Sequence, residues 1–272
     1  RRAFEYPLSR VYPQTSTGAT VAEGAFLSEG AALDLPLWTS GGPKVKRTAP
    51  RIGSAERAKP LVVLPAFPGT NCEWDMERAF RRAGARTRVL VFRNRSREDV
   101  RASTAELAAA IGEAQIVALS GGFSAGDEPD GSGKFIANAF RAPAVREALT
   151  ALLDRRDGLA IGVCNGFQAL IKLGLVPYGE YRDADASMPT LTFNALGRHV
   201  SRIVRTKAMS NLSPWLALDK VGEIHSIPVS HGEGRIAIAD GLAKELFAAG
   251  QVPFCYVDAE GAPTVAEPWN PN

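Results

Sequence analysis

The segment at residues 158–168 reads Gly-Leu-Ala-Ile-Gly-Val-Cys-Asn-Gly-Phe-Gln. Its apolar run and the helix-like segment through Leu173 predict a strand, a tight turn and a helix, with Cys164 at the apex of the turn. Gly162 and Gly166 suit such a turn because side chains there would strain it or collide with neighbouring strands. Free N–H groups of the helix would point at the sulfur and favour its anionic form. The segment therefore predicts a nucleophilic cysteine; the alternative is a buried structural cysteine.

Short strands and helices alternate around this elbow. Strands are expected at residues 61–64, 87–92, 115–120 and 159–163, and helices at 73–83, 97–111, 134–140 and 144–153. Thr70 or Asn71 is the expected cap of the first helix, and Gly84 its end. This alternation predicts an α/β fold with a mostly parallel sheet covered by helices on both faces. Ligands of such sheets bind beyond the carboxyl ends of the strands.

Both ends of the chain depart from this pattern. After Gly174, short strands are expected at residues 191–193, 200–205, 225–229, 235–239 and 254–257, with a helix at 242–249, and they predict an antiparallel extension. Residues 1–59 are rich in Pro, Gly, Ser and Thr without a sustained period, which predicts an extended linker or arm. The alternating α/β part and its extension are then expected to form one domain that spans residues 60–272.

Composition and charge bear on the expected partners and on the cellular compartment. The 272 residues carry a net charge of +3 and 45% hydrophobic residues, so neither a nucleic acid nor a membrane is an expected partner. Cys72, Cys164 and Cys255 are widely spaced, which suits a reducing cytoplasm, and no pair has metal-ligand spacing. The chain begins with Arg-Arg and not Met, so we expect a piece of a longer chain.

A second glycine-rich loop follows the strand at residues 115–120. Gly121 and Gly122 allow backbone N–H groups, including that of Phe123, to approach a ligand. One of these donors and the N–H of Asn165 would form an oxyanion hole. An ordinary glycine-rich turn is the alternative.

The loop at residues 67–72, Phe-Pro-Gly-Thr-Asn-Cys, follows the first strand. It either walls the same pocket or simply connects the strand to a helix, and the sequence does not choose between the two. Cys72 is interpreted as a packing residue.

A late loop contains His231 and Glu233 in the sequence His-Gly-Glu-Gly-Arg. A thiol nucleophile needs a base, and the base needs an orienting carboxylate, so this pair is a candidate. The alternative is a loop for contact or gating. His199 and His225 are interpreted as structural.

Several motifs together resemble class I, triad-type glutamine amidotransferases, and more narrowly the glutaminase domain of phosphoribosylformylglycinamidine synthase. They occur in family order as Phe67-Pro68-Gly69-Thr70-Asn71-Cys72-Glu73, Gly121-Gly122-Phe123-Ser124-Ala125-Gly126-Asp127, Gly162-Val163-Cys164-Asn165-Gly166-Phe167-Gln168 and His231-Gly232-Glu233-Gly234-Arg235. The stretches 127–134 and 35–47 resemble the large fused form of that enzyme and the connector leaving its synthetase portion. The resemblance identifies the chain as the C-terminal part of such a fused enzyme.

The resemblance implies a three-layer, flavodoxin-like amidotransferase fold and a reaction. Cys164 would attack the side-chain amide of L-glutamine, with Gly121, Gly122, Phe123, Asn165 and Gln168 binding the glutamine or its oxyanion. Ammonia would pass to the synthetase portion, where ATP and Mg convert formylglycinamide ribonucleotide to the amidine; this domain itself would need no cofactor or metal. Alternatives are a different acceptor, a cysteine hydrolase, or a docking module without catalysis.

One departure from the family concerns the base. The family's triad His and Glu lie in a late H-x-E motif, whereas this chain ends at Asn272, at a point resembling the sequence before that motif. Either the pair lies beyond Asn272, which we favour, or His231 and Glu233 take its place. In the favoured case, residues 60–272 are C-terminally incomplete, the chain as given is a weak glutaminase, and His231, Glu233 and Arg235 form a secondary or interface loop.

Overall fold

A computed structural model describes residues 59–126, 133–183, 185 and 187–272. The predicted arm at residues 1–59 lies outside the described part except for Lys59, and so does most of the 127–134 stretch. The chain divides into two compact units that meet in the sequence between Thr190 and Leu191. No helix in the described part combines the length and apolar character needed to cross a bilayer.

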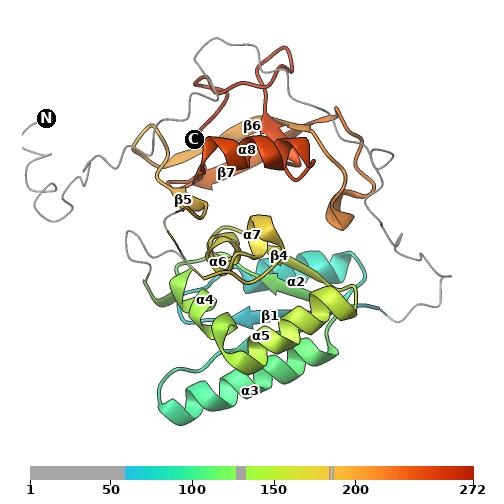
Figure 1. Ribbon diagram of the computed structural model, residues 1–272, viewed down its shortest axis with the longest axis vertical. Helices are drawn as coiled ribbons and strands as arrows, with labels where there is room; N and C mark the ends of the chain where they lie inside the picture. The colour runs from blue at the N-terminus through green and yellow to red at the C-terminus, as the bar shows by residue number, and fades with distance from the viewer. Residues whose placement is uncertain (1–58, 127–132, 184, 186) are drawn as a thin grey trace, which may run out of the picture. The chain divides into compact units, whose positions relative to one another are not determined.

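The unit before Leu191 is built on a four-stranded parallel sheet (Figure 1). Its strands are, in spatial order, β2 (Arg86–Val91), β1 (Leu61–Ala66), β3 (Ile116–Leu119) and β4 (Leu159–Gly162). The order 2-1-3-4 is that of flavodoxin-like sheets. The predicted α/β fold with a parallel sheet is therefore confirmed.

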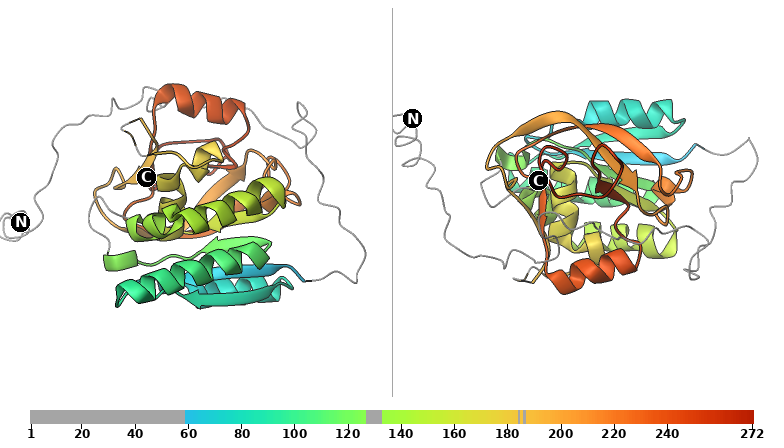
Figure 2. Two further views of the ribbon diagram at one scale, coloured as in Figure 1. Left: turned by 60° about the horizontal axis from the view of Figure 1, so that its bottom comes forward. Right: turned by 90° about the horizontal axis from the view of Figure 1, so that it is seen from above.

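Helices cover both faces of this sheet. They are α2 (Glu73–Arg82), α3 (Arg97–Glu113), α4 (Lys134–Arg141), α5 (Pro143–Thr150), α6 (Asn165–Leu173) and the short α7 (Leu175–Tyr178). A π-helical turn at Ala151–Arg155 extends α5. Helices α3 and α5 lie side by side (Figure 1), and α2 lies on the other side of the strands from α5 (Figure 2).

The pleat of β1 explains the three layers. All six of its residues are buried, and successive side chains point to opposite faces. Val62 and Leu64 pack with Met76 and Phe80 of α2, whereas Val63 belongs to the larger cluster on the opposite face. That cluster contains the fully buried side chains Leu107, Ile111, Phe140, Leu149 and Leu152. Burial of each such side chain contributes roughly 1.5–3 kcal/mol, so both faces stabilise the sheet.

The helix caps differ in part from prediction. Ser96 caps α3, since its Oγ accepts a hydrogen bond from the Asp99 N–H at 3.0 Å. The prediction that Thr70 or Asn71 caps α2 is wrong: Cys72 occupies the N-cap and makes no side-chain cap bond. Thr70 Oγ1 instead accepts from the Phe67 N–H at 3.0 Å, because the loop is turned back on itself before the helix begins.

The unit from Leu191 onward is mainly antiparallel. Strand β6 (Val200–Ala208) pairs with β7 (Ile224–His231) on one side and β9 (Phe254–Tyr256) on the other. A two-stranded sheet joins β5 (Thr190–Thr192) to β8 (Arg235–Ala237), and α8 spans Asp240–Ala248. The antiparallel strands expected after Gly174 are thus present and form sheets of their own. Strands β6 and β7 outrun their predicted bounds because their pairing continues from Val200–His231 to Lys207–Ile224.

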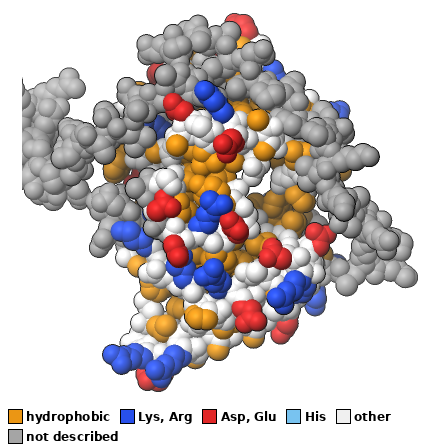
Figure 3. Space-filling view, viewed as in Figure 1, with side chains coloured by type: hydrophobic (Ala, Val, Ile, Leu, Met, Phe, Trp, Pro, Cys, Tyr) orange, Lys and Arg blue, Asp and Glu red, His pale blue; other side chains and the backbone are white. Residues whose placement is uncertain are grey.

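The visible surface of the first unit carries both basic and acidic side chains. On the face seen in Figure 3, basic and acidic side chains are interspersed over the helices of the first unit. Opposite charges pair at the surface, for example Arg88 with Glu113 at 2.8 Å. Such exposed pairs contribute little stability, about 0–1 kcal/mol each.

Cys255, on β9, provides a pH test of the second unit. Burial raises the pKa of its thiol from 9.0 to about 11. The unfolded thiol therefore ionises first, so stability present below pH 9.0 falls as pH rises toward about 11, by on the order of 2–3 kcal/mol. Urea unfolding across this range should show the loss, and Cys255→Ala should remove that part of the slope. Parallel slopes for both proteins would contradict the assignment.

Candidate active site

Cys164 occupies the apex of the predicted elbow. β4 ends at Gly162, α6 begins at Asn165, and between them Cys164 adopts φ 54° and ψ −113° with an exposed side chain. A non-glycine residue at positive φ is strained, and such strain persists only where the surroundings impose it. The strand–turn–helix geometry presents the sulfur to solvent, as a nucleophile elbow does.

Two close backbone approaches impose this turn. A Cβ on Gly162 would lie 2.5 Å from the carbonyl oxygen of Gly166, and a Cβ on Gly166 would lie 2.2 Å from that of Leu119 in β3. Neither distance is tolerated between real atoms, so the backbone must move if either glycine gains a side chain. The predicted reason for both glycines is therefore found in the structure.

The loops after β1 and β3 are joined beside the elbow. The Asn71 N–H donates to the Gly121 carbonyl oxygen at 3.3 Å, and the Phe123 N–H donates to that of Gly69 at 2.9 Å. Gly122 has φ 131°, and a Cβ there would lie 2.6 Å from the Thr70 Cα. These contacts place the 67–72 loop against the glycine pair, and its role as a pocket wall stays a prediction.

These bonds restrict which N–H groups can serve a ligand. The Phe123 N–H is used by Gly69, and the Ser124 N–H donates to Asn165 Oδ1 at 3.2 Å. In the described part of the chain, neither the Gly121 N–H nor the Gly122 N–H has a hydrogen-bond acceptor. Of the predicted loop donors, the N–H groups of Gly121 and Gly122 are left for an oxyanion. Phe123 is 67% exposed.

Asn165 and Gln168 are linked on the first turn of α6. The buried Asn165 side chain donates from Nδ2 to Gln168 Oε1 at 3.2 Å. Through Oδ1 it also holds the loop after β3, so it connects the elbow to the glycine pair. A glutamine-binding role for Gln168 stays a prediction.

Cys72 lies closer to the elbow than its sequence interpretation implied. A Cβ on Gly121 would lie 3.2 Å from Cys164 Cβ and 3.6 Å from Cys72 Sγ. The two cysteines therefore flank the glycine from different loops. Burial, and next the neighbouring Cys164, raise the pKa of the Cys72 thiol. Nothing in the sequence pattern linked the two residues, which are far apart along the chain.

His231 belongs to the second unit, at the end of β7. Its Nδ1 lies 2.9 Å from the Asn194 side-chain oxygen, which also accepts from the Gly234 N–H at 2.9 Å. That oxygen can only accept, so the proton is on Nδ1 and Nε2 is the basic nitrogen. Burial, and next His199, lower the pKa of His231. Both effects favour the neutral form of the ring.

Asn194 holds the His231 loop, a contact that the sequence did not reveal. It is buried, and its Nδ2 donates to the carbonyl oxygens of His231 and Arg198 at 2.9 and 3.1 Å. A Cβ on Gly234 would lie 2.3 Å from the His231 ring, so that glycine is required by the seated imidazole. One asparagine thus fixes the whole His-Gly-Glu-Gly-Arg loop.

Glu233 and Arg235 lie on the same loop and strand. Glu233 is half-buried, and the exposed Arg235 donates from Nε to the Phe193 carbonyl oxygen at 3.3 Å. The orienting partner found for the His231 ring is Asn194 Oδ1. The role of Glu233 as an orienting carboxylate stays a prediction.

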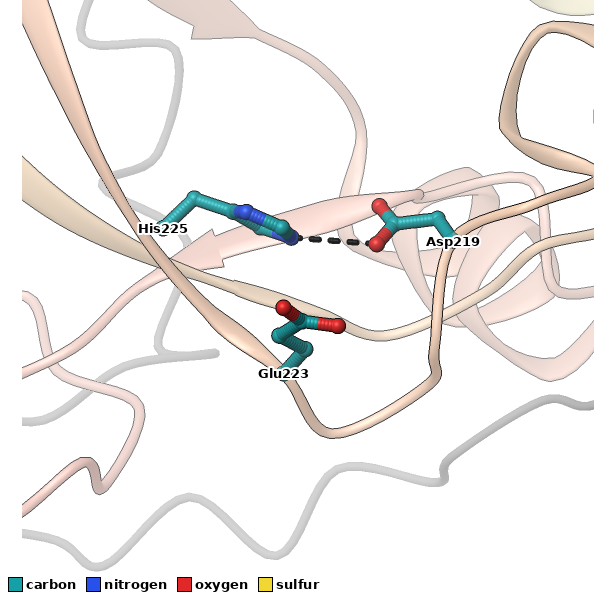
Figure 4. Close-up of side chains that lie close together, drawn as sticks. All are labelled: Asp219, Glu223 and His225. Carbon is teal, nitrogen blue, oxygen red and sulfur yellow. Dashed lines mark hydrogen bonds and ion pairs between the residues drawn. The ribbon is translucent and has the colours of Figure 1, made fainter.

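Asp219, Glu223 and His225 gather elsewhere in the second unit (Figure 4). One ligand atom from each lies within 4.8 Å of the others, and His225 Nε2 lies 3.1 Å from Asp219 Oδ1. Imidazole and carboxylates are donor types that zinc accepts. The His225–Asp219 hydrogen bond by itself explains why these side chains meet, since it ties the loop before β7 to the strand. His225 thus has the structural contact expected from the sequence.

A parallel α/β sheet with an exposed cysteine at a strand–helix elbow, beside a glycine loop, defines a nucleophile-elbow class of protein. Residues 59–272 match the CobB/CobQ-like glutamine amidotransferase domain family. Two phosphoribosylformylglycinamidine synthase subunits PurQ are similar in sequence. The one from Methanococcus maripaludis is 32% identical over 216 residues, covering 78% of this chain and 73% of that protein. The one from Dehalococcoides mccartyi is 33% identical over 217 residues, covering 79% and 76%.

A solved structure described as PurLQS from Thermotoga maritima is also similar, with 26% identity, a TM-score of 0.48, and coverage of 67% of this chain and 71% of that chain. From the family match and the PurQ relatives, the chain belongs to the glutamine amidotransferases of the phosphoribosylformylglycinamidine synthase type. The family predicted from the motifs is confirmed.

Gly166→Ala tests the elbow. The added Cβ meets the Leu119 carbonyl, so we expect a loss of about 1–3 kcal/mol in the free energy of unfolding. Gly112→Ala is the matched control, because that Cβ has nothing within 4 Å and removing a helical glycine stabilises by about 0.5–1 kcal/mol. Urea denaturation compares them, and equal stability of the two variants would contradict the close approach.

His199→Gln tests the electrostatics around His231. Removing a neighbouring positive charge should raise the pKa of His231, while burial continues to hold it below 6.5. An NMR titration of the ring signals measures this shift. His225→Gln is the control, because His225 lies on β7 with His231. It should leave the His231 titration unchanged. An unshifted His231 in His199→Gln would show that the two rings do not interact.

Proposed function

We propose that Cys164 of this chain hydrolyses L-glutamine and that the ammonia feeds an ATP-dependent conversion of formylglycinamide ribonucleotide to its amidine. The observation that carries the proposal is the exposed Cys164 at a strained elbow, with Cβ 3.2 Å from the position of a Cβ on Gly121. The names of the PurQ relatives support the acceptor reaction. This assignment explains why a thiol, a glycine pair and a helix N-terminus occur together.

The chemistry follows from the placement of the groups. The Cys164 sulfur attacks the side-chain amide carbon, and the tetrahedral oxyanion accepts a hydrogen bond from the Gly122 N–H. The C–N bond then breaks, ammonia leaves with an added proton, and a glutamyl thioester remains on Cys164. Water hydrolyses the thioester and releases glutamate. An N–H contribution from Asn165 is a further part of the proposal.

His231 is proposed to hold its loop and not to act as the base. Its Nδ1–H is bound to Asn194, and its ring packs against Gly234, where a Cβ would lie 2.3 Å from the ring. The base then comes from outside the described residues, in line with the late H-x-E motif of the family. Activity that depends fully on His231 would support the alternative.

The proposed partner is the synthetase portion of the same enzyme. Ammonia is protonated and lost in bulk water, so a dry path between the two sites follows from the chemistry. ATP and Mg belong to the synthetase site, and the amidotransferase unit itself needs no cofactor. A cytoplasmic setting is part of the same proposal, since free thiols and purine synthesis both suit it.

We also propose that this chain is the C-terminal part of a fused synthase. Support comes from the stretches 35–47 and 127–134, which resemble the fused form, whereas the similar curated proteins are separate PurQ subunits. An antibody against residues 59–272 should detect a polypeptide far larger than 29.0 kDa in native extracts. A band at the size of a single subunit would contradict the fusion.

A glutamine-analogue diazo-ketone tests the proposed nucleophile. In the complete enzyme it should alkylate Cys164, and excess glutamine should protect the thiol. Cys164→Ser should lose labelling and glutamate release by at least a hundredfold, since the thiolate chemistry is gone. Cys255→Ser removes a thiol in the other unit and is the matched control. It should retain both labelling and glutamate release. Labelling indifferent to glutamine would point to a cysteine hydrolase.

The same assay compares the two views of His231. If the residue holds its loop, His231→Gln should keep Cys164 labelling within a few-fold of the wild-type rate. Abolition of labelling as complete as in Cys164→Ser would make His231 the base.

A further inference from the structure

Cys72 and Cys164 approach one another across Gly121, a residue without a side chain. The position of a Cβ on Gly121 lies 3.6 Å from Cys72 Sγ and 3.2 Å from Cys164 Cβ. Both cysteines therefore touch the same small volume beside the elbow. Because no side chain extends from Gly121 into that volume, rotation about a Cα–Cβ bond can turn either sulfur toward the other.

We propose that Cys72 and Cys164 form a reversible disulfide when the protein meets a peroxide, with Cys72 as the resolving thiol. The site is a pair of redox-active thiols, and its chemical partner is hydrogen peroxide or a small organic peroxide. The disulfide stands on geometry alone; its effect on ammonia supply rests on the proposed function of Cys164.

The backbone holds both members of the pair in place. Cys72 begins α2, where its carbonyl oxygen accepts from the Met76 N–H at 3.1 Å. The residue before it, Asn71, is bound through its N–H to the Gly121 carbonyl, so the loop carrying Cys72 is fastened to the loop beside Cys164. Cys164 is fixed by the elbow. The approach of the two thiols is thus part of the fold.

The two thiols differ in the way that a redox pair requires. Cys164 is exposed, so a peroxide reaches its sulfur first. Cys72 is half-buried and donates its S–H to Asn71 Oδ1 at 3.1 Å. Burial raises the pKa of Cys72, which keeps it protonated while the exposed sulfur reacts. Cys72 is then in reserve to attack the oxidised partner.

The steps balance. The Cys164 sulfur attacks one peroxide oxygen, the O–O bond breaks, and a sulfenic acid forms with release of water or an alcohol. The Cys72 sulfur then attacks the Cys164 sulfur, loses its proton and displaces the hydroxyl as water. Two thiols are oxidised by two electrons, and one peroxide is reduced. An external dithiol reverses the change.

The disulfide would protect Cys164 from further oxidation and would stop the release of ammonia. A sulfenic acid left alone proceeds to sulfinic acid, which common thiols do not reverse. Capture by Cys72 stops the sequence at a reducible stage. While the disulfide lasts, Cys164 has no free sulfur, so an enzyme that uses it would release no ammonia.

The experiment treats the full chain with hydrogen peroxide and maps the peptides by mass spectrometry before and after dithiothreitol. Wild type and the matched control Cys255→Ser should yield a Cys72–Cys164 linked peptide that the reductant removes. Cys72→Ser should yield no link, and its Cys164 should reach sulfinic acid several-fold faster. Cys72→Ala, checked with Cys72→Ser by circular dichroism, separates this effect from loss of fold.

Equal rates of sulfinic acid formation in wild type and both Cys72 variants would overturn the proposal, as would a link that forms only between molecules. The mapping needs no enzyme activity. If glutamine protects Cys164 from labelling but no Cys72–Cys164 disulfide forms, only the redox proposal is rejected. If the disulfide forms but glutamine does not protect Cys164, only the proposed function is rejected.

Discussion

The close approach of α6 to the end of β3 is the constraint on which the site depends. Gly166 sits so near Leu119 that a single Cβ would lie 2.2 Å from the carbonyl oxygen. That contact draws the helix onto the sheet, shortens the turn and leaves Cys164 at φ 54°. The strain is tolerated because β3 and α6 are packed into one core, with Leu119, Ala169 and Leu170 in the same cluster.

Around this elbow, backbone groups supply most of the chemistry. The loops after β1 and β3 exchange hydrogen bonds, which use the Phe123 N–H and leave the N–H groups of Gly121 and Gly122. Backbone donors fixed by a sheet need no reorganisation when charge develops on a substrate. The same bonds bring Cys72 to the other side of Gly121. A catalytic frame and a pair of thiols therefore arise from one set of loop contacts.

The second unit is organised by a polar residue. Asn194 is buried, and its side chain binds two carbonyl oxygens, one imidazole nitrogen and one N–H group. Every polar atom of the amide is hydrogen-bonded, so burial of the amide carries little desolvation penalty. Because its oxygen accepts from His231 Nδ1, the amide also fixes the His231 tautomer. In the His-Gly-Glu-Gly-Arg motif, the His231 imidazole is therefore held by the Asn194 amide.

The sequence by itself determined the parallel α/β sheet, the elbow with its two glycines, and the family. These depend on local patterns: apolar runs set strands, and glycine spacing marks turns that only glycine fits. The tertiary structure alone decided which N–H groups of the glycine loop are left for a ligand, that Cys72 and Cys164 both lie beside Gly121, and that Asn194 holds His231. Each of these joins residues tens of positions apart, and the distance between such residues is set by how loops pack, which no local pattern encodes.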